Sequence, residues 1–284
     1  IQVYGLREME DLQPFFDDLY TACDEQDLPL ESGISEYAPG QFEFTLRHKA
    51  DALRATDDAI MYKRLVKGVA VAHGLEANSM AKPFAETAGS GMHLHISMND
   101  KDGKNAFASE DPAGTPLLRH AIGGMKSMLA ESMAIFAPNA NSFRRFKANS
   151  YAPVAATWGV NNRSVALRIP AGDIRARRVE HRPAGVDANP YLVAATVLAG
   201  IRHGLRNKID PGPEVTGNGY DAKTDIVMPD DWRSAIKLAT GSAFLKEALG
   251  EEMHRTFTAV KSAEYARVMR TVSEVDFDLY LHTV

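Results

Sequence analysis

The sequence predicts an α+β protein, because long stretches with helical periodicity alternate with short segments whose apolar and polar residues alternate. The strand-like segments span 89–97, 162–170 and 177–182, and the longest helix-like stretches span 51–74 and 116–137. With 284 residues, of which 45% are hydrophobic, the chain can bury the core of one large domain or of two small ones.

The composition limits the classes of partner. The formal net charge of −5 argues against a dedicated nucleic-acid or anionic-membrane binder. The longest apolar run, Leu192 to Ile201, is too short to cross a bilayer, and no signal peptide is visible. Cys23 is the only cysteine, which excludes an intrachain disulfide and fits a reducing cytosol. We therefore expect a cytoplasmic protein that binds neither nucleic acid nor membrane.

The N-terminal part predicts a helix followed by two short extended pieces. Residues 10–28 place apolar side chains at helical spacing, and the extended pieces lie on either side of Pro39-Gly40. Glu36 and Glu43 are seven positions apart, so an unbroken strand would send them to opposite faces. The Pro-Gly break lets the second piece change phase, and both carboxylates can then converge. Two glutamates near a turn are, however, more often solvent-exposed than functional.

Residues 51–74 predict a long amphipathic helix that ends at Gly74. We interpret His73, beside that stop, as part of the helix cap rather than as a catalytic residue. The predicted buried side consists of Leu53, Ile60, Met61, Leu65, Val66 and Val69.

The segment 89–97 combines glycines with an alternating pattern. Its apolar side chains are Met92, Leu94 and Ile96, and its polar ones are His93, His95 and Ser97. A strand would send the first set to a core and the second to the opposite face. Gly89 and Gly91 permit backbone angles and close ligand approaches that other residues do not. The segment predicts either a binding site or a half-buried strand whose histidines cover a polar face, and by itself favours neither.

The rest of the chain predicts further helices and two more strands. Helices are expected at 116–137, at 190–205 after the N-cap Asn189, at 231–249 and at 251–272, with loops at 141–153 and 207–225. The methionines of the first of these helices would fill the core. In the strand 177–182, alternation places Arg178, Glu180 and Arg182 on one face and Val179 and His181 on the other.

Arginines are concentrated in this part of the sequence. Six of them fall between Arg163 and Arg182, in a chain of negative net charge. Such a concentration of one sign indicates a polyanionic small ligand, for example a phosphate or a carboxylate. A nucleic-acid patch is the competing interpretation, but the aromatic residues that single-strand binding uses are absent from this stretch.

Three glutamates and one histidine predict a metal site. Glu36, Glu43, His93 and Glu180 form an oxygen-rich set that suits Mg²⁺ or Mn²⁺ better than a structural zinc. Phosphoryl transfer needs divalent ions beside arginines, because the ions bridge phosphate oxygens and the arginines neutralise developing charge. The sequence has no G-x-x-x-x-G-K-[ST] loop, so side chains and metals would have to hold a nucleotide.

Several motifs in a fixed order resemble the catalytic domain of the glutamine synthetase family over the whole chain, 1–284. After Glu36 they are A-P-G-Q-x-E at 38–43, K-P at 82–83, G-S-G-M-H-x-H at 89–95, N-S-F-R-R at 141–145, N-R-S at 162–164, R-I-P at 168–170, R-R-x-E-x-R at 177–182 and N-P-Y-L at 189–192. The resemblance implies one catalytic domain of the glutamine synthetase/guanidino kinase-like α+β fold, with a curved antiparallel sheet flanked by helices. In the family a β-grasp domain and a first metal-binding strand precede this region, so we expect the chain to be a fragment or to have lost its N-terminus.

The resemblance also implies a role for each matching residue. Glu36 and Glu43 would hold one divalent metal ion, and His93 and Glu180 a second. Gly89, Arg145 and Arg182 would contact glutamate, Arg163 would stabilise the transition state, and Arg168 and Arg178 would face ATP. Glu31, His95 and Ser97 would line the nucleotide pocket. ATP would phosphorylate the glutamate side chain, and an amine would then displace the phosphate to give an amide.

Tyr151 departs from the pattern of the ammonia-using members, which carry a glutamate at this position before Ala152-Pro153. The phenol is neutral at pH 7 and cannot bind ammonium by charge, whereas its ring can pack an alkyl chain or a cationic amine. The run 180–190 likewise resembles the γ-glutamylpolyamine (γ-glutamylputrescine) synthetase branch. We therefore expect Tyr151 in the catalytic set and an amine larger than ammonia, such as putrescine, as the substrate.

Two alternatives stay open at this point. One is an ordinary ammonia-using glutamine synthetase in which another carboxylate replaces the missing one, and the other is a non-catalytic structural relative. The retained charged residues argue against the second, because a scaffold has no need to keep buried charges together. For the assembled protein, the resemblance implies a homo-oligomer, a dodecamer of two stacked hexameric rings.

Overall fold

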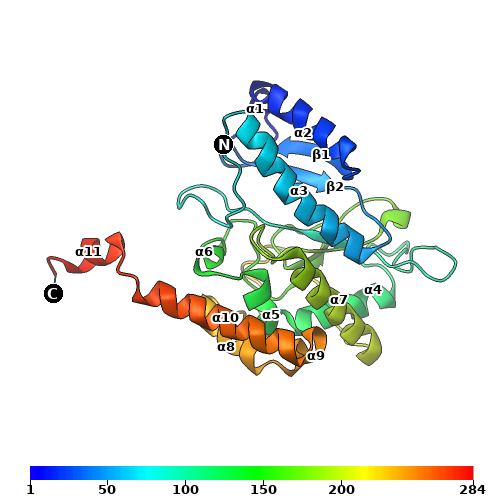
Figure 1. Ribbon diagram of the computed structural model, residues 1–284. Coiled ribbons are helices and arrows are strands. Elements are labelled where there is room, and N and C mark those ends of the chain that lie inside the picture. The colour runs from blue at the N-terminus through cyan, green and yellow to red at the C-terminus, as the bar shows by residue number, and fades with distance from the viewer. Residues whose placement is uncertain (284) are drawn as a thin grey trace.

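A β-hairpin and three helices form one part of the molecule, at the top of Figure 1, in a computed structural model that describes residues 1–283. The helices are α1 (Leu6–Asp11), α2 (Gln13–Glu25) and α3 (Ala52–Ala72), and the strands are β1 (Leu30–Ser35) and β2 (Phe42–Leu46). Phe15, Phe16, Leu19 and Cys23 of α2 are buried in the core that these elements share. The predicted N-terminal helix is thus confirmed, although it begins earlier and is interrupted at Leu12.

The hairpin and the long helix after it follow the predicted boundaries. The two strands pair antiparallel, and Gly40 in their connection has a φ of +73°, which favours glycine. Asp51 caps α3 by accepting from the N–H groups of Leu53 and Arg54, and His73 is the C-cap residue.

The predicted buried side of α3 is wrong at two positions. Leu53 and Met61 are exposed. The residues of α3 that pack against the core around α2 are Tyr62, Leu65, Val66 and Val69. The first turns of the helix instead bury Thr56 and Asp58. The Asp58 carboxylate pairs with Lys49 Nζ at 3.0 Å and Arg54 Nε at 2.8 Å, so polar contacts replace the apolar packing expected there.

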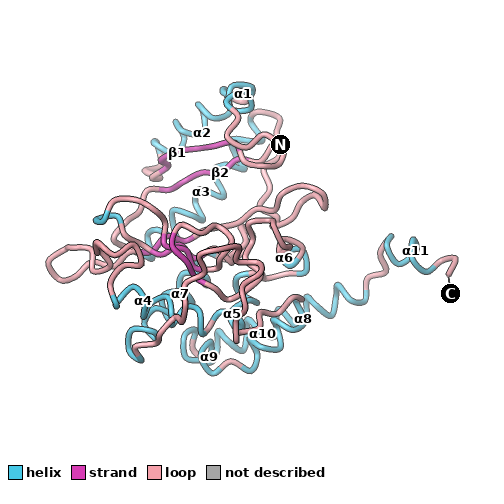
Figure 2. Tube along the Cα trace, turned by 180° about the vertical axis from the view of Figure 1, so that it is seen from behind, coloured by secondary structure: helices cyan, strands magenta, loops and turns pink. Residues whose placement is uncertain are grey.

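A four-stranded sheet lies between the hairpin part and the lower helices (Figure 2). Its order is β3-β6-β5-β4, with β3 (Leu94–Ile96), β4 (Trp158–Val160), β5 (Leu167–Ile169) and β6 (Val179–His181). The pairs β3–β6 and β5–β6 are antiparallel, but β4 and β5 run parallel because residues 161–166 carry the chain back along the sheet. The sheet is therefore mixed where an antiparallel sheet was predicted. β3, β5 and β6 are shorter than their predicted segments, and β4 was not predicted.

Helices α4 (Pro116–Ser127), α5 (Leu129–Phe136) and α7 (Pro190–Asn207) share a core with the lower side of this sheet. The remaining elements are the short α6 (Ala140–Phe143), the 3₁₀ turn η1 (Ile174–Ala176), α8 (Trp232–Gly241), α9 (Ala243–Leu249), α10 (Glu251–Arg270) and α11 (Glu274–Tyr280). The α+β class is confirmed, and Met125 and Met133 lie in the core as predicted. Two predicted helices are each divided, one at Met128 and one at Ser242, which caps α9. Val284, the last residue of the predicted domain, lies outside the described residues.

The C-terminal helices leave the body of the molecule. The end of α10 and the whole of α11 project away from the other helices in both views (Figures 1 and 2). This C-terminal arm, residues 267–283, exposes large apolar side chains, among them Met269, Val272, Phe277 and Leu281. Within the described residues, none of the helices has the length and apolar character that crossing a membrane requires.

Candidate active site

The register of β3 and β6 builds the centre of the site. Leu94 pairs with His181 and His95 with Glu180, so alternate residues of both strands face the same side. Val179 and His181 are buried on the side of the sheet that faces the helices, as the alternation predicts: Val179 lies in the core shared with α4, α5 and α7, and His181 packs against Phe136 of α5. The opposite face therefore receives the polar side chains of β3 and β6 together.

Glu180 is the most tightly held residue of that face and is only 2% exposed. Its Oε1 accepts a hydrogen bond from Arg182 Nη1 at 2.6 Å and lies 3.2 Å from His93 Nδ1. Its Oε2 accepts from Arg168 Nη1 at 2.9 Å. Burial alone would raise the pKa of Glu180, but Arg182 and its basic neighbours outweigh burial and lower the pKa to about 2. The residue is therefore a carboxylate at any pH at which the protein functions.

The two histidines beside it are neutral bases. Burial, reinforced by the charge of Arg182, lowers the pKa of His93 to about 3. Loss of hydration also lowers the pKa of His95, whose Nδ1 accepts from Arg178 Nε at 3.0 Å. A neutral imidazole is the form that binds metals, so His93 is suited to the ligand role predicted for it.

The β-hairpin contributes Glu36 and Glu43 from above. Gln41, in the turn between them, donates from Nε2 to the Gly89 carbonyl and to Ser90 Oγ, both at 3.0 Å. This side chain fixes the hairpin against the glycine segment, and the sequence analysis missed it. Its position inside the motif that contains Glu43 is the signal that could have found it.

Glu43 is electrostatically coupled to the sheet although its side chain is exposed. Partial loss of hydration raises its pKa, and the neighbouring charges of Glu36 and Glu180 raise it further, against Arg182 and Arg163. The carboxylates of Glu36 and Glu180 thus both lie near enough to act on Glu43 electrostatically. The convergence of Glu36 and Glu43 on one metal ion stays a prediction.

The predicted metal ligands have the right chemistry for a divalent cation, but they are not arranged closely enough to bind one. Carboxylate oxygens with one neutral imidazole suit Mg²⁺ or Mn²⁺, and a cation would relieve the repulsion that raises the pKa of Glu43. In residues 1–283, however, no three His, Cys, Asp or Glu side chains are close enough to hold an ion. Both oxygens of Glu180 already contact Arg182 or Arg168. Glu36, Glu43, His93 and Glu180 therefore remain predicted ligands.

The predicted glutamate contacts adjoin one another. Arg145 is 5% exposed, and its Nη2 donates to the carbonyls of Arg182 at 3.2 Å and Pro183 at 3.1 Å. A Cβ on Gly89 would lie 2.4 Å from Arg145 Cγ, so glycine is needed there for close approach. Arg182 reaches Tyr151 as well, donating from Nη2 to its carbonyl at 3.1 Å.

The three residues of the N-R-S motif serve different purposes: Arg163 is a predicted site residue, and its two neighbours bind a loop. Arg163 is exposed, and its Nη1 donates to the Tyr4 hydroxyl at 3.1 Å. On either side of it, Asn162 Nδ2 donates to the carbonyls of residues 215 and 217, and Ser164 Oγ accepts from the Gly219 N–H at 2.7 Å. Asn162 and Ser164 therefore anchor the loop 207–225, a role that the motif did not reveal.

Tyr151 projects from the loop that follows Arg145. The side chain is 50% exposed, and its φ of +58° is uncommon for a residue other than glycine. Its ring lies 5.8 Å from the ring of Tyr37, the residue after Glu36. This tyrosine pair joins the hairpin to the loop of Tyr151, and Tyr37 was missed because one aromatic residue beside a turn gives no signal.

Two predicted nucleotide contacts lie outside these interactions. Glu31 is exposed on β1 and faces Arg47 Nε at 3.8 Å, and Ser97 is exposed just beyond β3. Their roles stay predictions, as do those of the other site residues.

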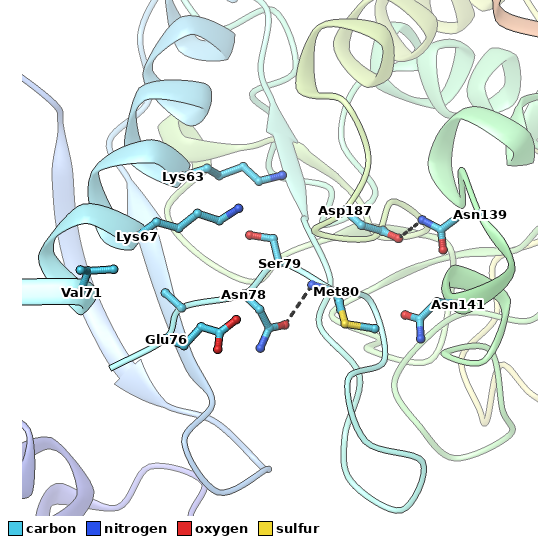
Figure 3. A pocket seen from close by; sticks show the side chains of 11 residues that line it. Lys63, Lys67, Val71, Glu76, Asn78, Ser79, Met80, Asn139, Asn141 and Asp187 are labelled. Carbon is cyan, nitrogen blue, oxygen red and sulfur yellow. Dashed lines mark hydrogen bonds between the residues drawn. The ribbon is translucent and has the colours of Figure 1, made fainter. Parts of the chain in front are cut away.

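A separate pocket of about 700 Å³ lies between α3 and the N-terminus of α6 (Figure 3). Lys63 and Lys67 project from α3 toward Asp187 and Asn139 on the other wall (Figure 3). None of the predicted site residues lines it.

Known proteins resemble the chain closely. A gamma-glutamylputrescine synthetase of Escherichia coli (strain K12) is 40% identical over 280 residues, which cover 99% of the chain and 59% of that relative. A glutamate–isopropylamine ligase of Pseudomonas sp is 39% identical over 203 residues, which cover 70% of the chain and 44% of that relative. The solved structure of ligand-free GmaS matches with a TM-score of 0.90 and 28% identity, covering 99% of the chain and 65% of that protein.

The chain thus spans less than two thirds of the length of each of these three proteins. Residues 1–280 match the family described as glutamine synthetase, catalytic domain. Together with the identity to the Escherichia coli enzyme, this match shows that the chain belongs to the glutamine synthetase family.

Proposed function

We propose that the protein joins the γ-carboxylate of glutamate to an amine at the expense of ATP, through a γ-glutamyl phosphate. The observation that carries this proposal is the cluster around Glu180, in which arginines and a neutral histidine surround one buried carboxylate beside two further glutamates. A scaffold protein would gain nothing from such a cluster, whereas phosphoryl transfer between anions requires one.

The chemistry follows from the weakness of a carboxylate as an electrophile. Phosphorylation gives the acyl carbon a good leaving group, and the amine then expels phosphate to leave the amide. Arg145 and Arg182 orient glutamate, and Arg163, Arg168 and Arg178 neutralise charge on the phosphates. The divalent ions, Mg²⁺ or Mn²⁺, would supply further charge neutralisation at the phosphate oxygens, held by Glu36 and Glu43 and by His93 and Glu180.

For the amine we propose a substrate larger than ammonia, with a diamine or polyamine such as putrescine as the first candidate. Support comes from the exposed rings of Tyr37 and Tyr151, which offer apolar faces beside the acidic Glu36. An aromatic face attracts a cationic amine and packs its alkyl chain. The names of the relatives point the same way, since two of them describe ligation of glutamate to putrescine or to isopropylamine.

We further propose that the protein works in the cytoplasm as a homo-oligomer, a dodecamer of stacked hexameric rings by family resemblance. The apolar side chains of the C-terminal arm support an assembly of identical subunits, because a single chain leaves them in water.

Phosphate release by the purified, assembled enzyme tests the proposal. ATP, Mg²⁺ and glutamate are supplied with ammonia, ethanolamine, putrescine or spermidine in parallel reactions. We expect glutamate-dependent release that is fastest with a diamine or polyamine. A preference for ammonia would identify an ordinary glutamine synthetase, and a protein that binds neither Mg²⁺ nor ATP would be a non-catalytic relative.

A further inference from the structure

Asp187 forms part of the pocket wall in Figure 3, and its Oδ1 lies at the same side of Gly185 as Nη1 of Arg145, a predicted glutamate contact. We propose that Asp187 is a positioning residue, whose negative charge holds the Arg145 guanidinium in the orientation that binds glutamate. This inference rests on the proposed function, because it concerns the glutamate subsite of the same reaction.

The Asp187 carboxylate is fixed from one side only. Its Oδ2 accepts hydrogen bonds from Asn139 Nδ2 at 2.8 Å and Ser142 Oγ at 2.7 Å. Asn139 and Ser142 are themselves fixed by the capping box at the start of α6. Asp187 Oδ1 is buried, and among the described residues no donor reaches it. One oxygen is thus clamped while the other keeps its full capacity to attract a positive group.

The Arg145 guanidinium shows the matching pattern. Its Nη2 donates to two backbone carbonyls of the segment that leads to Asp187. Its Nη1 is buried and has no hydrogen-bond partner in the part of the chain that the structure describes. Burial lowers the pKa of Arg145 to about 10, and the charge of Asp187 acts in the opposite direction. Asp187 therefore favours the charged guanidinium at a site that is otherwise unfavourable for charge.

Gly185 provides the space between the two free atoms. A Cβ built on it would lie 2.4 Å from Asp187 Oδ1 and 3.0 Å from Arg145 Nη1. Both atoms consequently face the same side of this residue. The backbone of Gly185 lies outside the left-handed region, so the position needs glycine for space and not for conformation.

The pocket accounts for Asp187 only in part: the charge of Asp187 favours the charged form of Lys63 and raises its pKa, against the larger effect of burial, but no hydrogen bond or ion pair joins the two side chains. Lys63, on the opposite wall, donates to the Val186 carbonyl at 2.6 Å, and Asn141 exchanges two hydrogen bonds with the backbone of Lys82. The Lys63 ammonium thus has a backbone partner, whereas the unsatisfied oxygen of Asp187 and the unsatisfied Nη1 of Arg145 lie at the same side of Gly185. Of the two cations, the fully buried arginine is therefore the one that this oxygen faces.

The first test is Asp187→Asn in the purified, assembled enzyme. Either orientation of the new amide removes the charge that faces Arg145. We expect the KM for glutamate to rise about tenfold or more, with the KM for ATP within about twofold of the wild type. Calorimetric titration with glutamate, in the presence of Mg²⁺ and a non-hydrolysable ATP analogue, should show the same loss of affinity without turnover.

Gly185→Ala tests the same placement of Asp187 relative to Arg145 while keeping the charge. The added methyl group must displace Asp187 Oδ1 or Arg145 Nη1, so glutamate affinity should fall in this variant as well. Asp57→Asn and Gly68→Ala are matched controls that should leave the KM for glutamate unchanged. Asp57 accepts from the Tyr191 hydroxyl, and no atom lies within 4 Å of a Cβ at Gly68.

The outcomes separate the two proposals. An Asp187→Asn enzyme with wild-type glutamate affinity and a lower Tm would overturn the inference, because Asp187 would then only support the fold. Wild-type enzyme that binds glutamate without releasing phosphate would contradict the proposed function, and the binding comparison would still decide the role of Asp187.

Discussion

The two glutamates nearest the centre of the site have opposite electrostatic environments. Glu180 is buried in β6 against Arg182 and Arg168, and its pKa is lowered to about 2. Glu43 is exposed on β2, and partial loss of hydration together with the charges of Glu36 and Glu180 raises its pKa. The same residue type is therefore stabilised as an anion by the sheet and destabilised as an anion by the hairpin.

The difference distinguishes two ways of completing a charged site. The sheet supplies its own counter-charges, so folding alone neutralises Glu180. Among the described residues, Glu36 and Glu43 have no cation in direct contact, and the hairpin carboxylates repel each other until a cation arrives. We therefore expect Glu180 to govern stability and Glu43 to govern metal dependence.

Glu180→Ala should have the largest effect. It removes a predicted metal ligand and leaves the buried Arg182 and the partly buried Arg168 without their counter-charge, which costs about 3 to 5 kcal/mol of unfolding free energy. ATP-dependent phosphate release should disappear, and urea denaturation should show the loss of stability. A variant that kept full activity would remove Glu180 from the metal site.

Glu43→Gln should separate activity from stability. The neutral amide relieves repulsion among the carboxylates, so the urea midpoint without metal should stay constant or rise. Activity should nevertheless fall strongly because a ligand of the first metal is lost. A clear loss of stability in metal-free Glu43→Gln would contradict the contrast with Glu180.

Magnesium should stabilise the wild type more as the pH rises. The pKa of Glu43 is raised above its ordinary value of 4.5, so this residue carries no electrostatic penalty below that pH. The penalty grows as the pH rises above 4.5 and is complete once the pH exceeds the folded-state pKa, and bound Mg²⁺ should remove it. His93 does not limit binding, because its pKa of about 3 keeps it neutral throughout.

The measurement is the increase in Tm caused by Mg²⁺, which should be larger near about pH 7 than near about pH 5. Glu43→Gln serves as the matched control and should lose most of this pH dependence. An equal Mg²⁺ effect at both pH values in the wild type would show that Glu43 is not a ligand.

Tyr151→Glu should alter the choice of amine with a smaller effect on the total rate. The substitution adds a third carboxylate near the hairpin, which can bind ammonium by charge, and it removes the ring that packs against Tyr37. Ammonia use should rise and polyamine use should fall in the phosphate-release assay. Unchanged amine preference would contradict the role assigned to Tyr151, and Tyr151→Phe, which keeps the ring, is the control.

Glu31→Ala should have the smallest effect on the fold. The carboxylate faces Arg47 at 3.8 Å on an exposed surface, so the unfolding free energy should change by less than about 1 kcal/mol. A several-fold rise in the KM for ATP, with the KM for glutamate unchanged, would support its predicted place in the nucleotide pocket. An unchanged KM for ATP would place Glu31 outside the site.

The sequence predicted the elements that period-two and helical patterns describe. The faces of β6 were correct because a strand must send Val179 and His181 to one side and Glu180 to the other. The α3 boundaries were correct because Asp51 and Gly74 are strong local signals. The parallel pairing of β4 and β5 could not be predicted, since it depends on how the turn between them directs the chain.

The site was predictable to a different extent. The motifs indicated residues that could bind a metal ion or a substrate directly, such as His93 and Arg145. They did not indicate the residues that position these side chains. Gln41 bonds to Gly89, 48 positions away, and the role proposed for Asp187 depends on its charge facing Arg145, 42 positions away; no local pattern encodes either relation. The pKa of Glu43 is raised and that of Glu180 is lowered, and both changes depend on burial and on charged neighbours from other elements, which the sequence does not show.

In the homo-oligomer proposed above, the C-terminal arm would link folding to protein concentration. Its apolar side chains, including Phe277 and Leu281, are exposed in the single chain and would gain burial when subunits meet. By mass action, the fraction of assembled protein and the apparent Tm should both rise with total protein concentration. Dilution would then shift the proposed assembly toward separate subunits and expose the arm to water. The cores of the hairpin part and of the sheet would still unfold only at higher temperature.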